Sequence, residues 1–359
     1  MKLCLINNLY SPYSVGGAEK VVERMAKERI KNGDQVVVIT LAGGDSKLSQ
    51  QGRTVEDGVA VYRFWAPNIF SYKNLDKHNF IFKLSWHKID ILNFWSGRII
   101  KKILEQEKPD EVQTHNLMGI GFGAPRVIQK LKIKHTHYLH DIQLVEPSGV
   151  LPWNHERDSL WQKIYSWIMR WRMGSPDAVL SPSEFLIGFY QKRGFFAGSH
   201  HHIITSSHHH MILNSERRAH NPTTFLFVGS LVEHKGIRVL MRAWNKIDKN
   251  AQVELRIVGD GKLKKEVEEW AKGDKRIKVY GRLDEKALAE VYKKSDVLIF
   301  PSICIENHPI VIDEAHQFGL RVIASDTGGV SEMVRLEDML VRPDDVERLG
   351  MEIERLLNC

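Results

Sequence analysis

Two glutamates, Glu306 and Glu314, stand in the segment PSICIENHPIVIDEAHQFG with seven residues between them. Pro309 is typical of the first turn of a helix, with Asn307 or His308 as its cap. Glu306 would then lie in the loop before the helix and Glu314 on the helix itself. The free amides of a first helical turn attract an anion such as a diphosphate, and carboxylates suit sugar hydroxyl groups. The arrangement indicates a site for a sugar nucleotide, although two acids at this spacing also occur by chance.

Two glycine turns could bring a phosphate close to the backbone. Gly16 and Gly17, in SVGGAEK, stand between an apolar run and an amphipathic stretch, where a backbone without Cβ atoms admits a ligand to a helix N-terminus. In FVGSLVEHKG, Gly229 ends another apolar run and Lys235 precedes the next amphipathic stretch. Lys235 is a candidate counter-ion for a phosphate at the carboxyl edge of a sheet. A tight turn and a solvated surface lysine are the alternative interpretations.

Histidines follow two short strand-like runs in the first half of the chain. His115 lies in VQTHNL, and His140 with Asp141 lies in YLHDIQ. If both runs are parallel strands, these side chains meet at one edge of a sheet. A histidine there could hydrogen-bond a substrate hydroxyl group or carry a proton. Structural histidines satisfied by their neighbours are the competing interpretation.

Strands and helices must alternate to position these residues. KLCLINNLY and DQVVVIT are strand-like and flank an amphipathic stretch that stops at Gly33, which predicts a βαβ unit and a parallel sheet. The runs DEVQTHNL, KHTHYLHD and DAVLSPS continue this first series. TTFLFVGS begins a second, independent series. Helices are expected near 97–106 and 121–131, then at 237–247, 263–272, 285–294 and from Pro309 onward.

The two series predict an α/β protein of two Rossmann-like, doubly wound parallel-sheet domains that face each other across a cleft. A length of 359 residues suits two such domains. The boundaries are expected as an N-terminal domain 1–198, a linker 199–222, a C-terminal domain 223–345 and a short C-terminal helix 346–359.

The composition limits the class of protein. A net charge of +7 is compatible with nucleic acid, an anionic membrane surface or a phosphate-bearing substrate. The basic residues are spread among carboxylates without a nucleic-acid-binding motif, so a nucleic-acid partner is not expected. Three cysteines at no paired or metal-ligand spacing indicate a reducing compartment, and we expect the cytoplasm. The chain starts as a strand, and no run approaches the roughly 18 apolar residues of a membrane span.

Two further segments carry unusual composition. Histidine triplets at 200–202 and 208–210 lie in the expected linker, where runs of one ligand type lack the fixed spacing of a dedicated metal site. Residues 73–108 combine eight Lys/Arg with four Asp/Glu and several aromatic residues. Such a basic, aromatic face suits anionic lipid headgroups. A core helix with ordinary surface lysines fits the same segment equally well.

Together these motifs resemble the retaining GT-B glycosyltransferases of the large E-x7-E family, known as glycosyltransferase group 1 or family 4. The run PSICIENHPIVIDEAHQFGLRVIASDTGGVSEMV matches the family's glutamate block and extends well past it. SPYSVGGAEKVV, HNLMGIG, LHDIQL, FVGSLVEHKG and IVGDG with VYGRL follow the family's order. The resemblance therefore covers nearly the whole chain.

The resemblance implies a nucleotide diphosphate sugar held mainly by the second domain, an acceptor on the first, and transfer with retention of configuration, without a metal or other cofactor. Glu306 would contact the transferred sugar and His115 would bind it from the first domain; these two are the expected catalytic residues. Lys235 would neutralise the diphosphate, and Glu314 would hold the ribose. The other expected residues are Gly16, Gly17, Gly229, Ser230, Gly281, Arg282, Asn307, Ile310 and Val311 for the donor, with His140 and Asp141 on the acceptor side.

Several positions depart from the family pattern. Ser230 stands where many members carry a second phosphate-binding arginine, and Gln113 replaces the first histidine of a frequent pair. Arg321 replaces a proline before VIAS, and SSHHH stands where the family has an NG turn. Relatives usually continue beyond the position of Cys359 through further helices. A natural short form and a truncated chain are both compatible with this difference.

Other functions remain open at this point. A GT-B nucleotide-sugar epimerase shares the two domains. A nucleotide-sugar-binding or scaffold protein without turnover is suggested by Ser230 and by the short C-terminus. The resemblance favours cell-envelope polysaccharide, glycolipid or glycan synthesis, with a saccharide or lipid-linked saccharide acceptor at the inner face of the cell membrane. The donor base and sugar, the acceptor and the oligomeric state are not indicated by the sequence.

Overall fold

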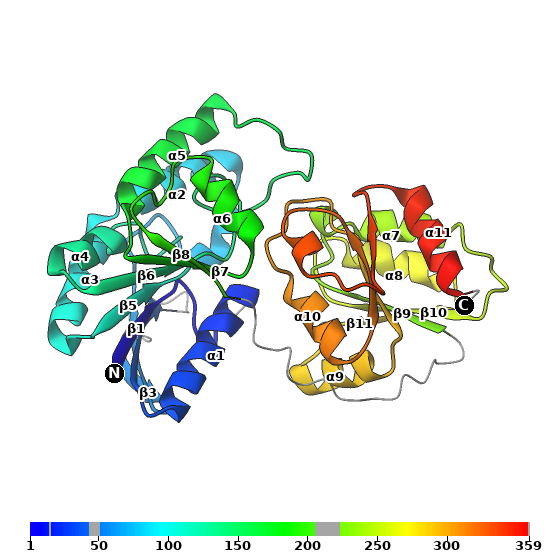
Figure 1. The fold of residues 1–359 in the computed structure, drawn as a ribbon, viewed down its shortest axis with the longest axis horizontal. Coiled ribbons are helices and arrows are strands. Elements are labelled where there is room, and N and C mark those ends of the chain that lie inside the picture. The colour runs from blue at the N-terminus through cyan, green and yellow to red at the C-terminus, as the bar shows by residue number, and fades with distance from the viewer. Residues whose placement is uncertain (14–15, 43–50, 205–222, 358–359) are drawn as a thin grey trace. The chain divides into compact units, whose positions relative to one another are not determined.

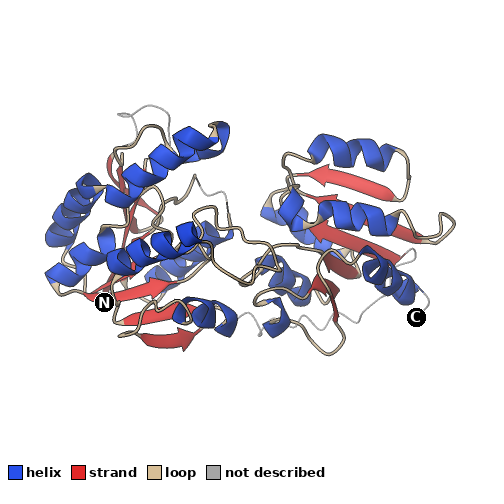
Figure 2. Cartoon of the chain, turned by 90° about the horizontal axis from the view of Figure 1, so that it is seen from above, coloured by secondary structure: helices blue, strands red, loops and turns tan. Residues whose placement is uncertain are grey.

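The computed structural model describes residues 1–13, 16–42, 51–204 and 223–357. The chain forms two compact units, each with helices on both sides of a largely parallel sheet (Figures 1 and 2). The expected pair of doubly wound α/β domains is therefore confirmed. The first unit consists of Met1–Gly149, Asp158–Pro182 and Leu186–Ile204; the second combines Val150–Arg157 and Ser183–Phe185 with the C-terminal part of the chain.

The first unit contains an eight-stranded sheet in the order β3-β4-β2-β1-β5-β6-β7-β8. Within the described residues of this sheet, β3 and β4 form the one antiparallel pair. The direction of the strand order changes between β1 and β5, which pair in parallel, so their carboxyl ends form a topological switch point. The strands are β1 (Lys2–Ile6), β2 (Gln35–Leu41), β3 (Gly52–Glu56), β4 (Val59–Phe64), β5 (Glu111–Thr114), β6 (Lys134–Tyr138), β7 (Ala178–Ser181) and β8 (His200–Ile203).

Side-chain caps begin three helices of this unit. Asn79, Asn93 and Ser159 each accept a hydrogen bond from a backbone amide of the first turn of α2, α3 and α5. Helix α4 contacts both α3 and α5, so the three helices form one layer. The helices are α1 (Gly17–Lys31), α2 (Phe80–Leu92), α3 (Phe94–Glu107), α4 (Ala124–Leu131), α5 (Leu160–Met173) and α6 (Glu184–Gln191), with a 3₁₀ turn at Tyr72–Lys77.

The second unit contains a six-stranded, wholly parallel sheet in the order β11-β10-β9-β12-β13-β14. Its switch point lies between β9 and β12. The elements are β9 (Thr223–Val228), β10 (Val253–Val258), β11 (Ile277–Gly281), β12 (Val297–Phe300), β13 (Arg321–Ser325), β14 (Met339–Val341), α7 (Ile237–Trp244), α8 (Lys264–Lys272), α9 (Glu285–Lys293), α10 (Ile310–Gln317) and α11 (Val346–Leu357), with 3₁₀ turns at Glu233–Lys235 and Val330–Glu332.

Burial explains why these segments become strands and helices. Strands of a parallel sheet covered on both faces read as continuous apolar runs, as in Val297–Phe300, where all four residues are buried. Helices instead bury one stripe, and α7 places Ile237, Leu240 and Trp244 in the core beside the sheet. The expected helices match α3, α4, α7, α8, α9 and α10 to within a few residues at their ends.

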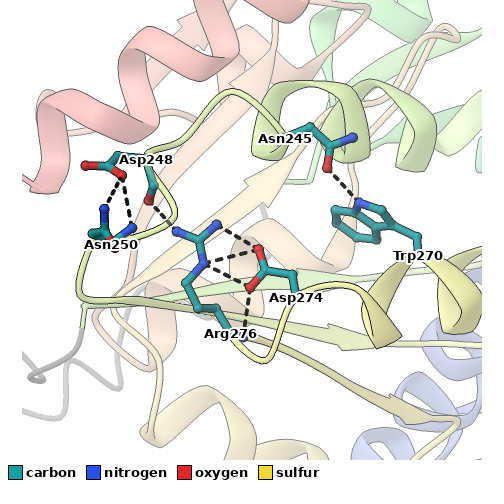
Figure 3. A network of polar contacts seen from close by, with 6 residues as sticks. All are labelled: Asn245, Asp248, Asn250, Trp270, Asp274 and Arg276. Atoms are coloured by element: carbon teal, nitrogen blue, oxygen red, sulfur yellow. Dashed lines mark hydrogen bonds and ion pairs between the residues drawn. The ribbon is translucent and has the colours of Figure 1, made fainter.

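The edge of the second sheet at the amino ends of β10 and β11 is fixed by a polar network (Figure 3). Arg276 donates from Nη2 to Asp274 Oδ2 (2.7 Å) and from Nη1 to the backbone oxygen of Asp248 (2.5 Å). Trp270 Nε1 donates to Asn245 Oδ1 (2.8 Å) and ties α8 to the end of α7. Because ligands of such sheets bind at the carboxyl edge, this network is structural.

The expected linker differs from the structure at its start. Residues His200–Ile203 form β8, which pairs in parallel with β7, because the chain can extend the first sheet by one more edge strand. The first histidine triplet therefore lies in a strand, while the second lies outside the described residues. The expected boundary at residue 198 also misses Val150–Arg157 and Ser183–Phe185, which pack in the second unit.

Among the described residues, none of the helices combines the length and the apolar character that crossing a bilayer requires.

Candidate active site

An ion pair stands at the switch point of the second sheet. Lys235 lies in the turn that follows β9, and Glu306 lies in the loop that follows the neighbouring strand β12. Lys235 Nζ and Glu306 Oε1 are 2.7 Å apart, and the two side chains are 28% and 12% exposed. The sequence predicted Lys235 at the carboxyl edge and Glu306 in the loop before a helix, and the structure brings the two side chains into direct contact.

Glu306 Oε1 accepts more than one hydrogen bond. Besides Lys235, the buried Ser302 hydroxyl donates to it at 2.7 Å, and the Cys304 thiol lies 3.5 Å away. Burial, followed by the charge of Glu306, raises the pKa of Cys304 to about 12, so this cysteine is a neutral thiol. Ser302 was not expected as a site residue, although it belongs to the PS pair at the start of the glutamate block.

The charge of Lys235 is maintained by its partner. Burial alone would lower the pKa of Lys235, but the nearby Glu306 carboxylate outweighs burial, and the pKa of Lys235 lies above its ordinary value. Lys235 is therefore a full positive charge near neutral pH. It is placed to compensate an anion at the end of β9.

Two glycines allow the loops around this pair to approach each other closely. At Gly236 (φ 71°) a Cβ atom would lie 1.7 Å from the backbone oxygen of Pro301, and at Gly328 (φ 62°) one would lie 1.9 Å from that of Glu306. Both positions combine a left-handed backbone with a contact that no side chain fits. The sequence did not single out either glycine, although the GG pair of the family block was a signal for Gly328.

Glu314 lies on α10 and is held by a tyrosine from α9. The hydroxyl group of the buried Tyr292 donates to Glu314 Oε2 at 2.9 Å, and the Tyr292 ring stacks on Phe318 with centroids 5.3 Å apart and an interplanar angle of 2°. Burial, followed by the Glu314 charge, raises the pKa of Tyr292, so the phenol remains a donor. Tyr292 is a further residue that the sequence did not indicate.

The start of α10 differs from the sequence expectation. Pro309 occupies the N-cap position, and no side chain caps the helix, so neither Asn307 nor His308 is the cap. Instead, the Asn307 side chain accepts a hydrogen bond from Ser183 Oγ, and His308 Nε2 lies 2.8 Å from Asp313 Oδ2. Local pairing to these partners competes with capping.

The first turn of α10 retains free backbone donors. Ile310 and Val311, both expected donor-binding residues, form this first turn and are half-buried. Since no side chain caps the helix, their amides and the helix dipole favour an anion at this end.

The other expected donor residues lie along the same carboxyl edge. Gly229 and Ser230 follow β9, where the Gly229 amide donates to the Val258 oxygen (3.0 Å) and Ser230 is exposed. Gly281 ends β11 with φ 69°, and Arg282 follows it with an exposed side chain. Because every strand of this sheet runs in the same direction, all of these residues share one edge with Lys235.

A small pocket in the first unit gathers the expected histidines. His115 follows β5, His140 follows β6, and both line this pocket with Tyr138 and Tyr190. His115 Nδ1 and His140 Nε2 are 2.9 Å apart, and the His140 ring stacks on Tyr138. His115 is 1% exposed, and its Nε2 atom has no hydrogen-bond partner within the part of the chain that the structure describes.

Burial keeps these histidines neutral. It lowers the pKa of His140 to about 3, with His137 as the second cause, and it lowers the pKa of His115 well below the ordinary value, with His140 as the second cause. Two neutral imidazoles suit hydrogen bonding to a hydroxyl group better than proton release. Of the two functional roles considered from the sequence, the lowered pKa values favour hydrogen bonding.

Asp141 and the first glycine turn complete the expected set. Burial raises the pKa of Asp141 to about 6, and its Oδ1 accepts the Gln143 amide at 2.9 Å. Gly16 is the N-cap of α1 and Gly17 its first residue. The Gly16 amide donates to Glu19 Oε2 at 2.7 Å, so a carboxylate of the same chain already occupies this donor.

Comparison with protein families matches most of the chain. The family model described as Glycosyltransferase Family 4 matches residues 15–206, which is more than half of the 359 residues. The family model described as Glycosyl transferases group 1 matches residues 222–359.

Individual proteins show the same likeness. An uncharacterized 42.6 kDa protein in the cps region of Klebsiella pneumoniae is 25% identical over 355 residues, covering 97% of this chain and 91% of its own length. Sucrose-phosphate synthase from Thermosynechococcus elongatus has a similar fold, with a TM-score of 0.72 at 19% identity, covering 99% of this chain and 90% of that one. HepE of Anabaena, solved in complex with UDP, gives a TM-score of 0.65 at 15% identity, covering 100% and 90%.

Proposed function

Because this chain belongs to the glycosyltransferases of group 1 and family 4, we propose that it transfers a hexose from a nucleoside diphosphate sugar to an acceptor hydroxyl group with retention of configuration. The observation that supports this most directly is the Lys235–Glu306 ion pair at the switch point of the second sheet. It places a cation and a carboxylate where open α/β sheets bind their ligands.

The roles follow from the chemistry of each group. Lys235 and the uncapped first turn of α10 compensate the charge of the diphosphate, which becomes the leaving group. Glu306 accepts hydrogen bonds from hydroxyl groups of the transferred sugar, and Glu314, oriented by Tyr292, accepts those of the ribose. His115 contributes a neutral hydrogen-bonding nitrogen to the sugar.

The transfer needs no protein nucleophile and no metal. The acceptor oxygen attacks the anomeric carbon on the face that the diphosphate leaves, and the departing phosphate takes the acceptor proton. Catalysis then rests on positioning and on stabilising the negative charge of the leaving group. Lys235 carries more of this charge than in relatives with an arginine at the position of Ser230.

The substrates are proposed from the comparisons. HepE of Anabaena was solved with UDP, and a uridine nucleotide is accordingly the first donor to test. The Klebsiella pneumoniae relative lies in a cps region, which supports a role in cell-envelope polysaccharide or glycolipid synthesis. The acceptor would be a saccharide or lipid-linked saccharide, reached at the inner face of the cell membrane.

A thermal-shift screen of UDP-, GDP- and ADP-sugars tests this proposal. A donor at one hundred times its dissociation constant stabilises the folded chain by about 2.7 kcal/mol. The donor should shift the unfolding temperature of the wild type and not that of Glu314→Ala. Glu347→Ala, which removes an exposed carboxylate paired with Lys246, is the matched control and should respond as the wild type does.

The reaction products separate this proposal from its alternatives. Nuclear magnetic resonance of the glycosidic product should show the anomeric configuration of the donor. Free nucleoside diphosphate released without an acceptor would favour an epimerase, and donor binding without turnover on any acceptor would favour a scaffold protein. If none of the three donor classes changes the unfolding temperature, the proposal that the chain binds a nucleotide sugar of this panel is contradicted.

A further inference from the structure

Helix α5 of the first unit presents an apolar stripe to solvent. Leu160, Ile164, Trp167 and Trp171 follow one another at helical spacing and are between 46% and 75% exposed. The opposite face of α5 is buried in the unit. An exposed stripe of this size with two tryptophans is uncommon on a soluble surface and marks a place of interaction.

The stripe continues onto the start of α3. Phe94 is 65% exposed and Trp95 is 62% exposed. The Arg172 guanidinium lies 5.3 Å from the ring centroid of Phe94 and 5.3 Å from that of Trp171, which joins the two helices into one surface. We name this surface the α5 face: Phe94, Trp95, Leu160, Ile164, Trp167 and Trp171.

Cations surround the α5 face without local neutralisation. Arg98 lies over the Trp95 ring and Arg126 over the Trp171 ring, and Lys163 is exposed on α5 itself. Neither Ala124–Leu131 nor Leu160–Met173 contains an acidic residue. Among the described residues, none of the cations Arg98, Arg126, Lys163, Arg170 and Arg172 forms an ion pair with a carboxylate.

Some surface cations of the second unit are paired with carboxylates. Arg238 lies 2.7 Å from Glu266 and Arg242 lies 2.7 Å from Asp344, both in the second unit. The positive charge around the α5 face has no such carboxylate partner among the described residues. A partner that complements it must be anionic and must also accept tryptophan side chains.

We infer that the α5 face docks on the surface of an anionic phospholipid bilayer, with the tryptophans at headgroup depth and the exposed cations Arg98 and Lys163 on lipid phosphates. This inference deepens the proposed function. It rests on that proposal in one respect, which is that a lipid-linked acceptor is presented at such a surface. Only part of the expected segment 73–108 belongs to this surface. Phe94 and Trp95 lie on the α5 face, whereas Trp86 is 1% exposed, donates from Nε1 to the Phe70 oxygen and belongs to the core.

Vesicle co-sedimentation of the full chain, without donor nucleotide, tests the inference. The wild type should bind vesicles containing phosphatidylglycerol at low salt and should not bind pure phosphatidylcholine. The double variant Trp167→Ser/Trp171→Ser should bind roughly tenfold more weakly. The charge variant Arg98→Gln/Lys163→Gln and a high salt concentration should both weaken binding, because the attraction is electrostatic.

A matched control removes exposed apolar residues from another helix of the first unit. Ile81→Ser/Leu92→Ser changes two exposed residues of α2 that do not belong to the α5 face, and it should leave vesicle binding unchanged. A blue shift of tryptophan fluorescence on binding should be lost in Trp167→Ser/Trp171→Ser. Circular dichroism establishes that each variant is folded.

Three results would overturn the inference. They are absence of binding to anionic vesicles, equal binding by the tryptophan double variant, and a concentration-dependent dimer that this variant abolishes, which would make a second copy of the chain the occupant. Because no donor is present, vesicle binding can succeed or fail independently of the nucleotide-sugar screen.

Discussion

Glu306→Gln should increase the affinity for a free nucleoside diphosphate while it abolishes sugar transfer. In the structure Lys235 is engaged by Glu306 at 2.7 Å, so a diphosphate must compete with the carboxylate for the same cation. Glutamine keeps the size of the side chain and can still accept from Ser302, but it withdraws the negative charge. Free UDP carries no sugar for Glu306 to contact, so the effect on Lys235 is isolated.

The magnitude follows from the distance between the charges. At 2.7 Å and an effective dielectric constant of about 20, two unit charges attract by about 6 kcal/mol. Desolvation of both groups offsets most of this, and we expect a net coupling of about 2 kcal/mol. In Glu306→Gln the diphosphate no longer has to displace this ion pair. If most of the coupling of about 2 kcal/mol then adds to the binding free energy, UDP should bind about tenfold more tightly, which corresponds to about 1.4 kcal/mol.

Isothermal titration calorimetry with UDP, GDP and ADP measures the effect. Glu269→Gln is the control, because it removes the same charge from an exposed pair with Lys272. Equal or weaker binding of the preferred nucleotide by Glu306→Gln would refute the competition between carboxylate and phosphate. A double-mutant cycle that combines Glu306→Gln with Lys235→Met measures the coupling between the two side chains without any ligand. With the free energy of unfolding measured in urea, the coupling should be about 2 kcal/mol.

Three other substitutions have definite expected outcomes. Gly236→Ala forces a left-handed alanine whose Cβ meets the Pro301 oxygen at 1.7 Å, so urea unfolding should show a loss of about 3 kcal/mol, and a loss under about 1 kcal/mol would contradict the crowding. The second substitution is Asp90→Asn. Burial raises the pKa of Asp90 from 3.8 to about 7, so between about pH 4 and pH 7 the carboxyl group is protonated in the folded state and ionised in the unfolded chain. Stability should therefore fall by about 4 kcal/mol as the pH rises through this window, and Asp90→Asn should remove that fall; parallel pH profiles of the two proteins would contradict it. Tyr292→Phe removes the hydrogen bond to Glu314 and should raise the KM for the donor about fivefold with little change in kcat, whereas an unchanged KM would show that Glu314 needs no support.

The fold was predictable because buried parallel strands and amphipathic helices leave periodic signals in the sequence. The apolar run Val297–Phe300 and the stripe of α7 are local patterns, and each predicts its own element. The position of Lys235 and Glu306 at a common edge also follows, since parallel strands end on the same side.

The supporting contacts could not be predicted in the same way. The hydrogen bond from Tyr292 to Glu314 joins two helices, and the approach of Gly236 to Pro301 joins two loops that are distant in the sequence. Neither leaves a periodic pattern. The expected cap at Asn307 was wrong for a related reason, since Ser183, which lies 124 positions upstream in the sequence, donates to its side chain instead.

The segment Val150–Arg157 has a consequence for exchanging parts between relatives. Its Pro152 forms a β-bridge with Cys304, the Trp153 amide donates to the Ile303 oxygen, and the Ile305 amide donates to the Leu151 oxygen. The conformation of the loop that carries Glu306 is thus stabilised by a segment about 150 residues earlier in the sequence. A chimera joined between residues 204 and 223 would contain Glu306 but would lack its native Val150–Arg157 segment, which supports the Glu306 loop. Donor specificity should therefore transfer between homologous enzymes only when the short upstream segment travels with the C-terminal half.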